Sequence, residues 1–174
     1  MIRRYDVIVP ARGNSFSAAL KDEVWFDPRW CEVRLQDLRR YVEEGYGFLS
    51  LHAGNCYRKD NRPEMAEFIG ISFKYHPPQC PDTVTANKPH SIVEGTGSFT
   101  VRDEHYIIDI VADDADIFLQ SVSDTTAGTQ AAGYTRAIGK GRLCVLTPGH
   151  TLSALSNPEY LKIIANALRW CAGR

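Results

Sequence analysis

Two histidines occupy matching places in the sequence, each close behind an apolar run. His52 ends the run "FLSLH" before Ala53 and Gly54, and His150 follows "RLCVLTPG". Histidine changes charge near neutral pH, so it suits proton transfer, and its ring nitrogens also bind metal ions. Ligands of open parallel sheets bind beyond the carboxyl ends of the strands, so we expect both side chains to open into one strand-end pocket.

The segment "DEHY" offers two adjacent carboxylates, Asp103 and Glu104. Successive side chains of an extended segment face opposite sides, so only one carboxylate can readily point into a pocket. We favour Glu104 for that place and expect Asp103 to cap a backbone group or pair with an arginine. His105 is expected to face solvent, whereas His76 and His90, which lie beside prolines, are expected to belong to loop structure.

Five cysteines are present, an odd number with no CxxC pair. This count argues against both a disulfide framework and a zinc site built from cysteines, so most are expected to be reduced structural thiols. Cys56 lies several residues beyond His52 and is interpreted as a small apolar residue. No HExxH motif is present, yet histidines with a carboxylate can hold a divalent ion such as zinc. The cofactor therefore stays unknown, with metal as an open alternative.

The first half of the chain alternates strands and helices. Residues 5–11, "YDVIVPA", and 48–52, "FLSLH", are typical of buried strands. Residues 34–47 place Leu35, Leu38, Tyr41 and Val42 at helical spacing before Gly45. The order strand, helix, strand with apolar runs predicts a mainly parallel α/β sheet covered by helices, in which residues 5–11, 48–52 and 142–148 are neighbours.

The second half predicts more strands and a closing helix. Residues 98–122 are interpreted as two strands joined at "ADDAD", and residues 134–150 as a hairpin that turns at 139–141. The closing helix has Asn157 as N-cap and Pro158 as its first residue. Its expected apolar stripe consists of Leu161, Ile164, Leu168 and Cys171.

The composition indicates one ordinary globular domain over residues 1–174. The chain is 44% hydrophobic and 24% charged, and 20 Lys plus Arg face 21 Asp plus Glu for a net charge of −1. Without a basic run, neither nucleic acid nor a membrane surface is an expected partner. The expected partners are therefore small molecules or copies of the chain itself. The N-terminal apolar run is too short for a signal sequence, so a cytoplasmic location is expected.

Six fragments in order resemble the ThuA-like (trehalose utilisation) family, which is related to the class I glutamine amidotransferase-like and flavodoxin-like folds. They are "GYGFLSLHAGN", "KYHP", "KPHSIVEG", "DEHY", "IGKGRLCVLTPGHT" and "NPEYLKIIANALRWCAG". The order Pro-His-Ser-Ile at 89–92 departs from the usual His-Pro-Ile. The resemblance implies a doubly wound sheet, and it suggests that His52, Glu104 and His150 converge.

The family normally begins with a further strand, a turn and a helix before the strand that is "YDVIVPA" here. The resemblance therefore implies that an N-terminal βαβ unit of roughly 30 residues is absent or encoded upstream of Met1. A sheet without that strand exposes backbone groups and apolar side chains on its neighbour. We expect the chain to form a homo-oligomer, or residues 16–30 to fold over the gap.

Carbohydrate catabolism is the function that the resemblance implies, with a sugar or keto-sugar derivative as substrate and a hydrolase or isomerase as the possible enzyme class. His52, Glu104 and His150 are the candidate catalytic residues. Asn55, Tyr57, Asp103 and Tyr106 are the candidate substrate-binding residues, because aromatic rings and mixed donors and acceptors match sugar hydroxyls. A non-catalytic carbohydrate-binding module is one alternative, and amidotransferase-like hydrolysis through Cys56 is another.

Overall fold

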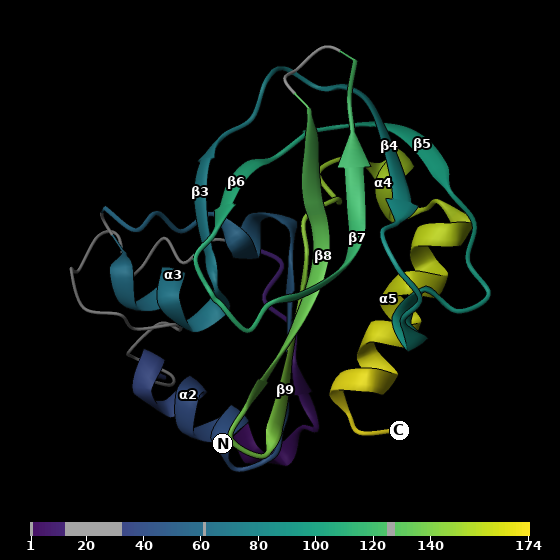
Figure 1. Ribbon diagram of the computed structural model, residues 1–174. Helices are drawn as coiled ribbons and strands as arrows, with labels where there is room; N and C mark the ends of the chain where they lie inside the picture. Colours follow the sequence, from purple (N-terminus) through teal and green to yellow (C-terminus); the bar gives the residue numbers. More distant parts are fainter. Residues whose placement is uncertain (1, 13–32, 61, 125–127) are drawn as a thin grey trace.

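Seven strands form the main sheet of the computed structural model, which describes residues 2–12, 33–60, 62–124 and 128–174 (Figure 1). In spatial order these strands are β1 (Val7–Ile8), β2 (Gly47–Leu51), β9 (Gly141–Leu146), β8 (Thr129–Ile138), β7 (Asp116–Val122), β4 (Cys80–Ala86) and β5 (Phe99–Asp103). A second sheet pairs β3 (Ile71–Tyr75) with β6 (Ile107–Ile110) in antiparallel direction.

The parallel part of the main sheet lies at one end of the strand order. β1, β2 and β9 are parallel neighbours, as the sequence predicted. Successive side chains point to opposite faces, so Phe48 and Leu143 enter one apolar core while Leu49 and Cys144 enter the other. Burial on both faces explains why these strands are almost continuously apolar.

The expectation of a mainly parallel sheet is wrong for the rest of the molecule. The pairs β9/β8, β8/β7, β7/β4 and β4/β5 are all antiparallel, so the sheet is mixed. The physical reason lies in the connections. β8 and β9 are joined through Gly139 and Lys140, and parallel strands need a crossover of a dozen or more residues.

Helices cover both faces of the sheet (Figure 1). On one side lie α2 (Leu35–Glu43) and α3 (Pro63–Ile69), and on the other lie α4 (Leu152–Leu155) and α5 (Pro158–Cys171). Short 3₁₀ turns are η1 (Ile2–Arg4), η2 (His52–Asn55) and η3 (Ser91–Val93). Within the described residues, no helix combines the length and the apolar character that crossing a membrane requires.

The closing helix begins as predicted, but the stripe that it buries shares only Cys171 with the expected one. The Asn157 side chain accepts hydrogen bonds from the backbone of Glu159 and Tyr160, and Pro158 is the first helical residue. The buried positions are Tyr160, Ile163, Ala167 and Cys171. Leu161 and Leu168 are exposed instead. The Tyr160 hydroxyl donates to the Pro148 carbonyl at 2.7 Å, which sets the helix face one residue away from the expected stripe.

The segment 98–122 forms three strands rather than the expected two. The chain leaves the main sheet after Asp103, and residues 107–110 pair with β3 in the second sheet. Glu104, His105 and Tyr106 therefore lie on the connection between the two sheets. Residues 16–30, the expected alternative cover for the edge at β1, lie outside the described residues.

Candidate functional site

His52 lies at the end of β2, where the backbone turns into η2. Its φ of 40° is in the left-handed region that residues other than glycine rarely adopt. The ring is buried, and its Nδ1 lies 2.9 Å from the carbonyl oxygen of Thr147 behind β9. The ends of two parallel strands thus hold this one imidazole.

The contact with Thr147 decides which ring nitrogen of His52 carries the proton. A carbonyl oxygen can only accept, so Nδ1–H donates to it and Nε2 of the neutral ring keeps its lone pair. Burial lowers the pKa of His52, which favours the neutral ring at neutral pH. The site therefore presents an unprotonated nitrogen at Nε2.

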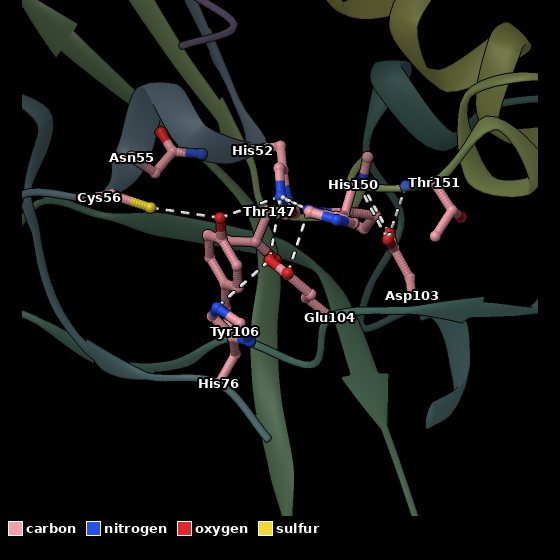
Figure 2. Close-up of polar contacts among 12 residues, drawn as sticks. His52, Asn55, Cys56, His76, Asp103, Glu104, Tyr106, Thr147, His150 and Thr151 are labelled. Carbon is pink, nitrogen blue, oxygen red and sulfur yellow. Dashed lines mark hydrogen bonds and ion pairs between the residues drawn. The ribbon is translucent and has the colours of Figure 1, made fainter. Parts of the chain in front are cut away.

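Three side chains gather around Nε2 of His52 (Figure 2). The Tyr106 hydroxyl lies 3.0 Å from it, Nδ1 of His150 3.3 Å and Oε2 of Glu104 3.4 Å. His150 Nδ1 is also 3.1 Å from Oε1 of Glu104. We call His52, Glu104, Tyr106 and His150 the strand-end cluster. The predicted catalytic residues lie together in it.

Tyr106 supplies a hydrogen-bond donor to this cluster. Burial raises the pKa of the Tyr106 hydroxyl far above its ordinary value, so the group keeps its proton. Cys56 continues the chain of contacts, with its Sγ 3.2 Å from the Tyr106 oxygen. Cys56 is an exposed residue, and partial burial of its thiol raises the pKa of that group. A protonated thiol is a poor nucleophile, which argues against amidotransferase-like chemistry at Cys56.

Asp103 holds the loop that carries His150. Its buried carboxylate accepts the backbone N–H groups of Gly149, His150 and Thr151 at 2.7, 2.9 and 3.1 Å. Gly149 has a φ of 131°, a backbone conformation that suits glycine. Asp103 thus positions His150 and does not face a substrate, which agrees with the expected capping role rather than with substrate binding.

Asn55 and Tyr57 also lie behind the cluster rather than at its surface. Asn55 is fully buried and its Nδ2 donates to the Leu146 carbonyl at 2.9 Å, which ties η2 to the end of β9. Tyr57 is 4% exposed and belongs to the apolar core around α2 and α3. Of the four predicted substrate-binding residues, only Tyr106 brings its polar group to Nε2 of His52.

The sequence interpretation missed the place of His76. Its Nδ1 lies 3.0 Å from the Pro77 carbonyl, so Nδ1–H donates there, and its Nε2 lies 3.5 Å from Oε2 of Glu104. His76 follows β3, which pairs with the strand directly after Tyr106. The sequence interpretation treated β5 and β6 as one strand. It therefore did not foresee that β3 pairs with β6 and brings His76 close to Glu104.

The expectation that His105 faces solvent is wrong. His105 is fully buried, and its Nδ1 lies 3.0 Å from Oδ1 of Asp82 on β4, which is also buried. The carboxylate accepts from Nδ1–H, and this pair anchors the connection that carries Glu104 and Tyr106. Neighbouring side chains of an extended segment point to opposite sides. Because Glu104 points into the cluster, His105 points the other way, into the core.

Three members of the cluster could hold a metal ion. His52, Glu104 and His150 each offer one ligand atom, and these atoms lie within 4.8 Å of one another. They differ in access, because His52 is buried, Glu104 half-buried and His150 exposed.

The fold and the cluster define a mixed α/β protein with histidines and a glutamate at adjoining strand ends. The sequence model of ThuA, described as trehalose utilisation, matches residues 2–171, and the chain therefore belongs to the ThuA family. This confirms the resemblance found in the sequence. At the level of the family, the role is carbohydrate-related. No curated protein matches the chain.

Solved structures show the same fold at low sequence identity. A ThuA-like protein from Parabacteroides merdae has a TM-score of 0.75 at 16% identity, covering 99% of this chain and 72% of that one. A ThuA-like protein from Bacteroides uniformis has a TM-score of 0.69 at 18% identity, covering 96% and 69%. A β-galactosidase from Bacillus circulans has a TM-score of 0.64 at 14% identity, covering 99% of this chain but 23% of that enzyme.

Proposed function

We propose that this protein is an enzyme of carbohydrate catabolism that acts on a sugar or keto-sugar derivative at the strand-end cluster. The observation that carries the proposal is the convergence of His52, Glu104 and His150 within 3.1 to 3.4 Å of one another. Membership of a family described as trehalose utilisation supplies the substrate class.

The cluster combines the donors and acceptors that sugar chemistry requires. Glu104 and Nε2 of His52 accept hydrogen bonds from hydroxyl groups, and the protonated Tyr106 hydroxyl donates one. The histidines and the glutamate can transfer protons to and from a sugar hydroxyl or carbonyl, or they can hold a cation that polarises the same group.

We place the protein in the cytoplasm. Cys56, Cys80, Cys144 and Cys171 are free thiols, which is typical of a reducing compartment.

A second candidate function is a non-catalytic carbohydrate-binding or accessory module. The specific observation in its favour is the β-galactosidase, in which this fold accounts for 23% of a larger enzyme chain. A module of this kind would bind sugar without converting it, so turnover separates the two candidates.

The test is a substrate screen with the full chain and matched variants. Trehalose, other disaccharides and their 3-keto derivatives are incubated with the wild type, Glu104→Gln and His150→Gln, and products are identified by NMR. We expect one sugar class to be converted and both variants to lose about 100-fold in turnover. The control Glu94→Gln changes an exposed carboxylate outside the cluster and should retain wild-type turnover. Binding without conversion would favour the accessory module, and turnover unchanged in both cluster variants would contradict the proposed site.

A further inference from the structure

We propose that His52, Glu104 and His150 bind a divalent transition-metal ion of the zinc type. The inference builds on the proposed function, because it concerns the same three side chains, but it concerns binding of the metal itself and can be tested without any sugar.

The spacing of the three side chains matches a metal site. Zinc bonds of about 2.0–2.1 Å with tetrahedral angles put neighbouring ligand atoms about 3.3 Å apart. The observed separations are 3.3 Å from His52 Nε2 to His150 Nδ1, 3.1 Å from His150 Nδ1 to one oxygen of Glu104, Oε1, and 3.4 Å from His52 Nε2 to its other oxygen, Oε2. With one ligand atom taken from each residue, the three atoms lie within 4.8 Å of one another. Two imidazoles and one carboxylate are also a ligand set that zinc uses in catalytic sites.

The backbone prepares His52 as a ligand. A metal-binding histidine commonly donates its other ring N–H to a carbonyl or carboxylate, which fixes the tautomer and the ring orientation. His52 does this through Nδ1–H and the Thr147 carbonyl at 2.9 Å, so Nε2 is the nitrogen left for a metal. The strained φ of 40° at this residue aims the ring toward Glu104 and His150.

Several ring nitrogens that can accept a hydrogen bond face the carboxylate of Glu104. His52 and His76 both donate Nδ1–H to backbone carbonyls, so each ring turns its Nε2 atom toward the carboxylate of Glu104, at 3.4 and 3.5 Å. Positive charge placed among these atoms, from a proton or from a bound cation, stabilises the carboxylate. The single proton of the Tyr106 hydroxyl serves only one of these acceptors, and a bound divalent cation would stabilise the whole group.

The arrangement leaves access from solvent. The His150 side chain is 43% exposed, while those of His52 and Glu104 are 9% and 12% exposed. A metal bound by three protein ligands keeps a further position for water or for a substrate oxygen. A hydroxyl or carbonyl oxygen of a sugar is the class of ligand that suits this position, and the metal would polarise it as a Lewis acid.

The rival account is that protons alone hold the cluster together, with His150 protonated on Nδ1 and donating to Glu104. The test is calorimetric titration of metal-stripped full-length protein with zinc chloride, repeated with Co²⁺ to read the coordination geometry from its visible absorption. We expect one zinc per chain with a dissociation constant in the micromolar range or below, and a tetrahedral Co²⁺ spectrum.

Variants assign the binding to these residues. His150→Ala removes an exposed side chain and Glu104→Gln keeps its shape, so both should fold, and each should weaken zinc binding by about 100-fold or more. His90→Asn is the matched control, because it removes an imidazole elsewhere and leaves an asparagine, a favourable N-cap residue, at the start of η3. It should bind zinc like the wild type.

No saturable zinc binding by the wild type, or an affinity of His150→Ala equal to that of the wild type, would overturn the proposal. Sugar turnover by protein that binds no metal would overturn the metal proposal alone, and zinc binding without turnover of any sugar would overturn the proposed function alone.

Discussion

His52 combines a functional position with an unfavourable backbone. A non-glycine residue at a φ of 40° costs on the order of 1–3 kcal/mol, and such residues concentrate at functional sites. The contact of Nδ1 with Thr147 and the tight surroundings of Nε2 hold the ring in place despite that cost. The strain therefore has a local reason, which is to direct the imidazole toward Glu104.

At position 52, glycine should give a more stable protein than alanine, which is the reverse of the usual order. Both remove the ring, but glycine adopts a positive φ without steric conflict and alanine does not. We expect His52→Gly to exceed His52→Ala in free energy of unfolding by about 1 kcal/mol, measured by urea denaturation. Leu161, exposed within α5, is the control, where alanine should exceed glycine by about 1 kcal/mol. If His52→Ala were also more stable than His52→Gly, the result would argue against backbone strain at position 52.

Cys56 should react slowly at neutral pH and be dispensable for chemistry. Because burial raises the pKa of the thiol above its ordinary value, less thiolate is present at neutral pH than in a free cysteine, and the thiolate fraction grows as pH rises. Alkylation by iodoacetamide, followed at Cys56 by peptide mass spectrometry, should therefore be slower than for a cysteine peptide and accelerate at alkaline pH. Cys56→Ser should keep most of the turnover. Fast alkylation at neutral pH with loss of turnover in Cys56→Ser would revive the amidotransferase alternative.

The sequence indicated which histidines and which glutamate lie in the cluster better than it indicated which polar residues support them from behind. His52 and His150 follow from their positions behind apolar runs, and Glu104 from alternation along an extended segment with the family resemblance. Asn55, Tyr57 and Asp103 have polar groups that suit sugars equally well, yet they are buried supports. A polar side chain that binds a ligand and one that satisfies a buried backbone group look alike in a sequence, because the difference lies in partners that are distant along the chain.

At the scale of elements, the site depends on where strands end. β2 and β9 are parallel neighbours with Leu51 opposite Leu146, so the residues that follow them lie at the same edge of the sheet. The chain leaves β5 at Asp103 beside that edge, and the buried His105–Asp82 pair anchors the connection to β4. Three separate elements therefore bring the cluster together.

Asp103→Ala should loosen the loop that carries His150. The change leaves three backbone N–H groups without their charged acceptor, and hydrogen bonds to charged groups contribute about 1.5–3 kcal/mol each. We expect the free energy of unfolding to fall by about 3 kcal/mol in urea denaturation, less than three such bonds together, because the loop is partly exposed and water can replace part of the lost acceptor. Asp113→Ala, at an exposed residue, should change it by less than about 0.5 kcal/mol. A similarly small effect for Asp103→Ala would show that the loop holds without this carboxylate.

The direction of the strands was only partly accessible from the sequence. Continuous apolar runs predicted the parallel trio correctly, because burial on both faces requires them. The hairpin at 139–141 was also predicted, and it already requires β8 to be antiparallel to β9. The pairing of β3 with β6 was not accessible, because it joins segments that are far apart in sequence and resemble ordinary strands.

At the scale of the whole molecule, β1 is the feature that bears on assembly. Among the described residues, β1 pairs with β2 only and forms one end of the main sheet. Tyr5 and Val9 beside it are 64% and 42% exposed. An edge strand with exposed apolar neighbours offers backbone groups and apolar surface to another chain.

We propose that the protein self-associates through this edge. Light scattering coupled to size-exclusion chromatography should give a mass of a dimer or higher oligomer for the full chain. Val9→Lys should shift it toward monomer, because a charged side chain at an edge opposes pairing. Leu152→Lys, at an exposed residue of α4, is the control and should leave the mass unchanged. A stable, monodisperse wild-type monomer would contradict the proposal.

The central claim is that His52 and His150 act as one site for a sugar, and NMR of the imidazole nitrogens tests it most directly. Protein labelled with ¹⁵N-histidine is titrated with trehalose, other disaccharides and their 3-keto derivatives while all side-chain resonances are followed. The account predicts that the sugar that binds shifts the resonances of His52 and His150 together and saturably, while those of His90, on the η3 turn, stay unchanged. Sugar binding that leaves both resonances unmoved, or a complete absence of shifts with every sugar tested, would contradict it.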